Sequence, residues 1–283
     1  PNTQIQARTG GNPDLNAEQA DTWTAGVVLR PSFIPRLSIT VDYFNIEIGN
    51  AIATAGGGAA NIMNLCFNVF QDPNNGFCQL VNRNTSTGAL DGSVNADGSI
   101  ASVFAGVANL SSIKTRGFDI GVDYTIPMAF GLFSSESKLN LNFLGSIYQR
   151  NTFQPVLGIN SFIECAGFYG TRCGTPQGKF QSQSRVTWMD GPMTTNLRWR
   201  YLGAVRDDNP TVTYVVERIP AYSLFDLSFA YDLTDNVSIT AGVNNLFDRK
   251  PPILGTNQEQ ANTFPSSYDT LGRDYFISVG FRF

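Results

Sequence analysis

The sequence has 283 residues, of which only 15% are charged, and its net charge is −4. An average soluble domain carries about 25% charged residues, and the slight negative charge argues against a nucleic-acid partner. The sequence contains no histidine, which excludes Ser-His and Cys-His nucleophilic catalysis and His-ligated zinc. No apolar run approaches the roughly 20 residues that a membrane-spanning helix needs.

Nine segments alternate apolar and polar side chains, which is the pattern of a β-strand with two different neighbours. The stretch "NLRWRY", for example, sets Leu197 and Trp199 against Arg198. In chain order, the pattern predicts strands within residues 21–30, 36–48, 111–127, 137–150, 179–190, 193–203, 221–233, 236–247 and 272–283.

The connections between these segments alternate in length. Short turns alternate with long connections, which occupy about residues 50–111, 151–178, 205–220 and 248–272. Connections this long are uncommon within a compact domain unless they are functional. Short turns on one side and long loops on the other are the layout of an outer-membrane β-barrel, whose short turns face the periplasm.

The alternative is an antiparallel β-sandwich or a soluble barrel, whose strands would also alternate apolar and polar side chains. Two features favour the membrane barrel: a polar face that carries Arg, Asp and Asn in mid-strand, and aromatic side chains at strand ends of the apolar face. Bacterial single-chain barrels have even strand numbers, so an odd set indicates part of a larger barrel. We predict an all-β fold, a portion of a transmembrane antiparallel β-barrel with about nine C-terminal strands of a larger barrel. Residues 1–20 would end an extracellular loop, and residues 21–283 would form the barrel part.

Five segments in order resemble the TonB-dependent outer-membrane receptor family. They are "NPDLNAEQADTWTAGVVLRP" (12–31), "VDYFNIEIGNAI" (41–52), "TRGFDIGVDYTIP" (115–127), "AGVNNLFDRKPP" (241–252) and "YFISVGFRF" (275–283). The family's barrel has about 22 strands around a plugged lumen. The N-terminal plug domain and the segment that contacts TonB have no counterpart in these residues, so the resemblance covers the C-terminal part of a receptor.

The resemblance implies an importer of a scarce nutrient in the outer membrane of a Gram-negative bacterium. The nutrient would be a small-molecule substrate of the siderophore, cobalamin or carbohydrate class, with energy from the inner membrane through the TonB complex and the plug. Further partners would be outer-membrane lipid and the barrel-assembly machinery. The alternative is a passive porin-like or structural, adhesive barrel. An enzyme is not expected, since no catalytic constellation is present, and no cofactor is expected.

The four cysteines fall into two local pairs in the first two long connections. Cys66 and Cys78 are twelve residues apart, and Cys165 and Cys173 are eight apart. The proposed outer side of the membrane is oxidising. Three pairings are formally possible, and locality favours two loop-closing disulfides, Cys66–Cys78 and Cys165–Cys173. A metal site is not expected, because neither spacing is Cys-x-x-Cys and histidine is absent.

Aromatic side chains and one arginine in the long connections are the candidate substrate-binding residues. Such residues suit sugar rings or an aryl siderophore, and the alternative is that they pack loop against loop. In the same connections, "RDDNP" (206–210) is interpreted as solvated charge, and "DGSVNADGS" (91–99) as turns, since it lacks the Glu of a calcium loop. The candidates are Phe162, Phe168, Tyr169, Arg172, Tyr214, Phe264 and Tyr268.

The last strand is predicted to serve as lipid-facing surface and as the signal that the barrel-assembly machinery recognises. Its apolar side chains occupy alternate positions up to the final residue. They are Tyr275, Ile277, Val279, Phe281 and Phe283.

Overall fold

The computed structural model describes residues 5–154, 162–170, 172–209, 212–255 and 257–282. Phe283, the last residue of the predicted assembly signal, lies outside them. The chain forms two compact units. The first comprises Pro1–Thr22, Ile46–Lys114 and Thr152–Ile163, and the second comprises Trp23–Asn45, Thr115–Asn151 and Glu164–Phe283.

Nine strands of the described residues follow one another across a single sheet, in the order β17-β16-β15-β12-β11-β7-β6-β3-β2, with the short β8 (Ile163–Glu164) paired to β7. The pairings from β7 to β17 are antiparallel. The all-β barrel fold and its nine strands are therefore confirmed. Their bounds are β2 (Gln19–Leu29), β3 (Leu37–Thr54), β6 (Val107–Met128), β7 (Ser137–Gln154), β11 (Phe180–Asp190), β12 (Met193–Leu202), β15 (Tyr222–Thr234), β16 (Val237–Asn244) and β17 (Asp274–Phe281).

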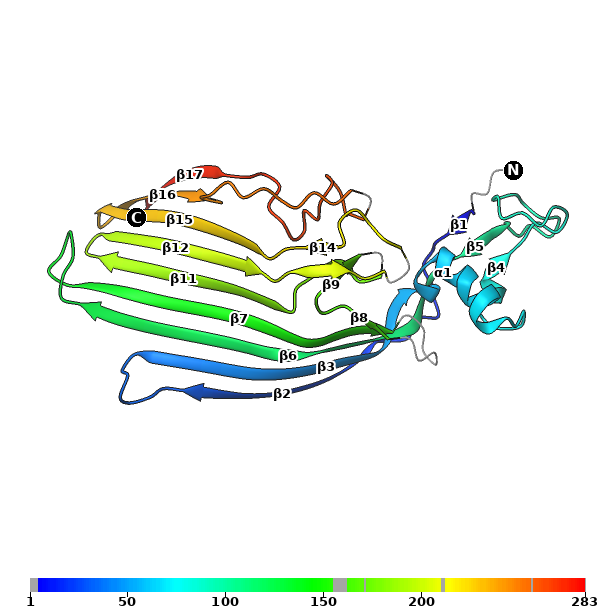
Figure 1. Cartoon of the computed structure of the whole chain (residues 1–283), viewed down its shortest axis with the longest axis horizontal. Coiled ribbons are helices and arrows are strands. Elements are labelled where there is room, and N and C mark those ends of the chain that lie inside the picture. The colour runs from blue at the N-terminus through cyan, green and yellow to red at the C-terminus, as the bar shows by residue number, and fades with distance from the viewer. Residues whose placement is uncertain (1–4, 155–161, 171, 210–211, 256, 283) are drawn as a thin grey trace. The chain divides into compact units, whose positions relative to one another are not determined.

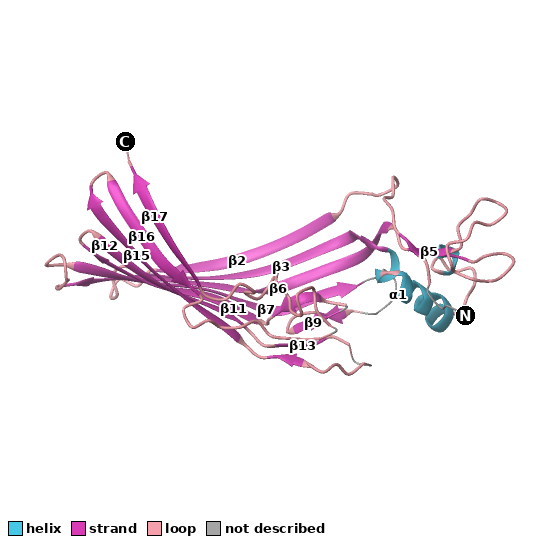
Figure 2. Cartoon of the chain, turned by 90° about the horizontal axis from the view of Figure 1, so that it is seen from above, coloured by secondary structure: helices cyan, strands magenta, loops and turns pink. Residues whose placement is uncertain are grey.

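The short turns of the second unit lie together at one end of its sheet, the left end in Figure 1. Phe281 of β17 pairs with Val237, beside the 235–236 turn, so the C-terminal strand also ends there. Viewed from above, successive strands rotate relative to one another, which is the normal twist of a sheet (Figure 2). Strands β2 and β17 end the path, and both are exposed along their whole length.

One face of the sheet is apolar. The register places Trp199 opposite Phe225 and Leu197 opposite Val186. The rings of Trp199 and Phe225 stack with their centroids 5.8 Å apart, and 38% of Trp199 is exposed. This face therefore presents large apolar side chains outward, as a lipid-facing surface does.

The opposite face carries a polar network. Asp226 accepts hydrogen bonds from Arg198 Nε at 2.9 Å and from Arg200 Nε at 3.1 Å. Asp123 accepts one from Asn140 Nδ2 at 3.2 Å. Both partners of each pair come from positions that the alternation assigned to the polar face, so these residues lie on the face that the sequence predicted.

The first unit contains the first long connection, which is folded. Its sheet has the order β1 (Ala7–Arg8), β5 (Ser102–Phe104), β4 (Val81–Asn82). The chain also forms the 3-10 turn η1 (Ala55–Gly57), helix α1 (Ala59–Asn64), the π-helix η2 (Leu65–Phe70) and the 3-10 turn η3 (Cys78–Leu80).

A small core stabilises this unit. Ile62 of α1 and Val103 of β5 are fully buried among Ala55, Leu90 and Ala105. The sequence pattern did not predict these elements. No described helix is long and apolar enough to cross a membrane.

Substitution of the two neighbours Val279 and Ser278 tests which face of β17 meets lipid. Val279 pairs with Ile239 on the apolar face, and Ser278 pairs with Thr240 on the polar face. We expect Val279→Arg in the whole protein to cost about 2–4 kcal/mol near the bilayer midplane and to lower its level in the outer membrane. The matched control Ser278→Arg should leave that level unchanged, as measured by quantitative blotting of membrane fractions. Equal losses for both variants would contradict the assignment of the faces.

Candidate ligand-binding site

The long connections of the second unit form a small sheet of their own. Its strand order is β10 (Gly174–Gln177), β9 (Phe168–Gly170), β13 (Val205–Asp207), β14 (Arg218–Ile219). Strand β9 pairs antiparallel with β10 and parallel with β13. The second and third long connections are therefore joined by backbone hydrogen bonds.

A hydrophobic cluster, which includes residues of this sheet, joins these connections to the last one. The Tyr169 and Phe264 rings meet edge to face, with centroids 5.7 Å apart, and Tyr222 and Tyr268 do so at 5.1 Å. The Tyr169 hydroxyl donates a hydrogen bond to the Val216 carbonyl at 2.6 Å. The cluster residues are Tyr169, Val205, Ile219, Tyr222, Leu224, Leu254, Phe264 and Tyr268.

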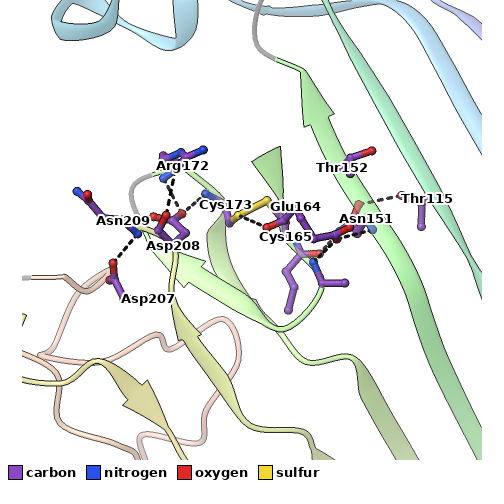
Figure 3. Close-up of a disulfide and its surroundings, with 12 residues drawn as sticks. Thr115, Asn151, Thr152, Glu164, Cys165, Arg172, Cys173, Asp207, Asp208 and Asn209 are labelled. Carbon is purple, nitrogen blue, oxygen red and sulfur yellow. Dashed lines mark hydrogen bonds between the residues drawn. A yellow bond between two sulfur atoms is a disulfide. The ribbon is translucent and has the colours of Figure 1, made fainter. Parts of the chain in front are cut away.

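A buried carboxylate orders the loop that the second disulfide closes (Figure 3). Asp208 Oδ2 accepts hydrogen bonds from the backbone N–H groups of Arg172, at 2.8 Å, and Cys173, at 2.5 Å. Arg172 Nη1 donates to the Asp208 carbonyl at 3.1 Å. At the other end of the loop, Glu164 Oε1 accepts from the N–H groups of Asn151 and Ala166, both at 2.9 Å.

The interpretation of "RDDNP" as solvated charge was wrong. Asp207 and Asp208 are each only 8% exposed. Asp207 accepts from the N–H of Asn209 at 2.8 Å and from the Asn257 side chain. Adjacent acidic residues in a long connection usually face water, so the sequence carried no sign that backbone amides and an amide side chain far along the chain would surround them.

Burial also changes the proton affinity of two groups in this region. It raises the pKa of Asp207, against the hydrogen bonds from Asn209 and Asn257, which lower it. Burial raises the pKa of Tyr169 to about 12, and the charges of Asp207 and Glu217 add to the rise. A raised folded pKa means that the stabilising contribution of the Tyr169 hydroxyl is full below its ordinary value of 10.0 and is lost as pH rises through about 12.

Both predicted disulfides are present. Cys66 pairs with Cys78 in the first unit, and Cys165 pairs with Cys173 in the second. Among the described residues, no group of three or more acidic or cysteine side chains could hold a metal ion. Asp91 and Asp97, the calcium-like pair, each accept hydrogen bonds from the serine two residues later, which also lowers the pKa of each carboxyl.

The predicted binding residues divide into buried and accessible sets. Tyr169, Phe264 and Tyr268 belong to the hydrophobic cluster, so these side chains pack loop against loop. Phe168 and Tyr214 are half-buried, and Arg172 is exposed, all in the second unit. Phe162 is 50% exposed and belongs to the first unit.

A two-faced antiparallel sheet with short turns at one end and structured long connections at the other is the wall of an outer-membrane β-barrel. The family model described as "TonB dependent receptor-like, beta-barrel" matches residues 2–246. This chain belongs to that family, whose members are receptors and transporters of Gram-negative outer membranes.

Known proteins agree with this assignment. The chain is 32% identical over 90 residues, 31% of its length, to the vitamin B12 transporter BtuB of Vibrio cholerae, and 29% identical over 121 residues, 37% of its length, to the ferrienterobactin receptor of Escherichia coli. These matches cover 13% and 16% of those proteins.

Solved structures share the fold. The ferric enterobactin receptor of Pseudomonas aeruginosa aligns with a TM-score of 0.59 at 15% identity, and the siderophore receptor PirA of Acinetobacter baumannii with 0.54 at 15%. Each alignment covers 97% of this chain and 33% of the other. The chain therefore spans about a third of the length of these receptors.

Mass spectrometry of unreduced whole protein tests the disulfides. Peptides linking Cys66 to Cys78 and Cys165 to Cys173 are expected. Each disulfide restricts the unfolded chain and so stabilises the folded protein by roughly 2–3 kcal/mol for loops of this size. Reduction should increase loop mobility while the barrel persists. Four free thiols, or links between the two loops, would contradict the pairing.

Substitution of Asp208 tests the order of the second disulfide loop. Asp208→Ala leaves two backbone N–H groups without their acceptor, which costs about 1–3 kcal/mol. Faster hydrogen exchange is therefore expected at the Arg172 and Cys173 amides, as measured by mass spectrometry on the whole protein. Asp235→Ala, in an exposed short turn, is the control and should leave this exchange unchanged. Unaltered exchange in Asp208→Ala would mean that the carboxylate does not hold the loop.

Proposed function

We propose that the whole protein imports a scarce nutrient across the outer membrane of a Gram-negative bacterium, with energy delivered from the inner membrane by the TonB complex. The observation that carries the proposal is the family match over residues 2–246. The two-faced sheet supports it, because its polar face suits a water-filled or plugged lumen and its apolar face suits lipid.

Other strands of the whole protein complete the barrel in this proposal. Strands β2 and β17 end the sheet path and are exposed along their length. Lipid does not tolerate unpaired strand edges, because their backbone groups would lack partners. Residues 1–20 then end an extracellular loop, and the long connections lie outside the cell. The apolar residues of β17, with Phe283, serve as the signal read by the assembly machinery.

The nutrient is of the siderophore, cobalamin or carbohydrate class. The curated relatives are named for vitamin B12 and for ferrienterobactin. In the second unit, Phe168, Arg172 and Tyr214 are the accessible predicted residues, and Phe162 is accessible in the first. The buried Tyr169, Phe264 and Tyr268 pack the long connections of the second unit against one another.

Arg172 is the residue of this set whose charge gives the sharpest test. Its backbone is fixed by Asp208, while its side chain remains exposed. With purified whole protein and ferric enterobactin or cyanocobalamin as probes, we expect Arg172→Ala to weaken binding of the recognised solute about tenfold. The matched control is Arg30→Ala, an exposed arginine at the short-turn end of the same unit, and it should bind like the parent.

Energy dependence separates import from a passive barrel. Uptake of the bound solute by cells should stop when the proton gradient of the inner membrane is dissipated, while binding persists. Uptake that continues at the full rate would overturn the proposal in favour of the porin-like alternative.

A further inference from the structure

The turn between β6 and β7 exposes three large apolar side chains at the short-turn end of the second unit. Phe130 is 63% exposed, Leu132 is 76% and Phe133 is 52%. The short turn between β15 and β16, by contrast, consists of Asp235 and Asn236. Exposed apolar clusters of this kind in a turn mark a contact surface.

The carboxylate of Asp190 holds this turn in place through hydrogen bonds. Asp190, at the end of β11, is fully buried. Its Oδ2 accepts hydrogen bonds from the N–H groups of Leu132, at 2.5 Å, and Phe133, at 3.0 Å. Its Oδ1 accepts from the N–H of Ser134 at 3.0 Å and from the Ser134 hydroxyl at 2.6 Å. The exposure of the three apolar side chains therefore belongs to a fixed turn conformation.

The turn is fixed on the apolar side of the sheet. Asp190 follows Trp188 and Val186 at alternate positions of β11, and Val186 pairs with Leu141 and Leu197. The Phe133 ring packs edge to face on Tyr231, with centroids 5.5 Å apart. Without the turn, the Asp190 carboxylate would face lipid. The backbone N–H groups of the turn donate hydrogen bonds to it, and the turn covers it.

We propose that this turn, residues 129–136, is an anchor that inserts Phe130, Leu132 and Phe133 into the bilayer interface of the membrane leaflet nearer the short turns. The three side chains contact the boundary between the lipid headgroups and the acyl chains. The apolar side chains continue the outward apolar face, through the contact of Phe133 with Tyr231, and aromatic residues in barrels are enriched at this level of the membrane. Asp190 is the positioning residue, and the anchor does not depend on which solute is imported.

Photocrosslinking in the whole protein in cells tests the anchor. Benzoylphenylalanine at position 132 reacts with the C–H bonds within its reach, and mass spectrometry identifies the adduct. Adducts with phospholipid acyl chains are expected at position 132, and none at the control position 236. A crosslink at 132 to a discrete protein, or no lipid adduct there, would overturn the proposal.

A second variant tests the role of Asp190. Asp190→Ala should reduce the lipid adduct at position 132 severalfold. The milder Ser134→Ala should reduce it less, because it removes the hydroxyl contacts with Asp190 and with the Glu136 carbonyl but keeps the three backbone N–H groups on Asp190. Yields are normalised to the amount of assembled protein, so that a loss of assembly in Asp190→Ala is not read as a loss of contact. Unchanged adduct yields in both variants would show that Asp190 does not position the turn. Solute uptake is measured in parallel, so failure of import and failure of anchoring give different results.

Discussion

Pairing of every backbone amide across a sheet with two unlike faces is the constraint on which this structure depends. Lipid offers no hydrogen-bond partners, so only closed sheets and helices cross it. Once strands pair antiparallel, side chains alternate strictly between the faces. In this sheet, Trp199 and Phe225 lie on the apolar face, and Arg198 and Asp226 lie on the polar face. The same period of two decides where each charge is tolerated.

The long connections at the other end of the sheet are held in place by other contacts. The long connections of the second unit are held by backbone pairing of β9 with β13, by a cluster of buried tyrosines and by the carboxylate of Asp208. These contacts leave Arg172 exposed on a fixed backbone. A receptor gains from this arrangement, because a binding residue that is already positioned loses less conformational entropy when a solute binds.

Alternation made the existence and order of the nine strands predictable from the sequence, because a strand with one apolar and one polar neighbour leaves its period in the chain. Their ends were less predictable, since β3 runs on to Thr54 and β6 begins at Val107, beyond the predicted segments 36–48 and 111–127. Locality made the disulfides predictable, since each pair is close in sequence. The burial of Asp207 and Asp208 was not predictable, because their partners at Arg172 and Asn257 come from other connections. Helix α1 and the small β1-β5-β4 sheet of the first unit were also missed, since short elements around a small core leave no long period. Among the candidate binding residues, composition did not separate the buried Tyr169 from the exposed Arg172.

A nitroxide scan along β12 tests the central claim most directly. Single spin labels at residues 195–200 of the whole protein in bilayers would be compared for collision with oxygen, which concentrates in lipid, and with a water-soluble nickel complex. The account predicts a period of two, in which labels at 195, 197 and 199 collide preferentially with oxygen and labels at 196, 198 and 200 do not. A flat profile, or one with the opposite phase, would contradict it.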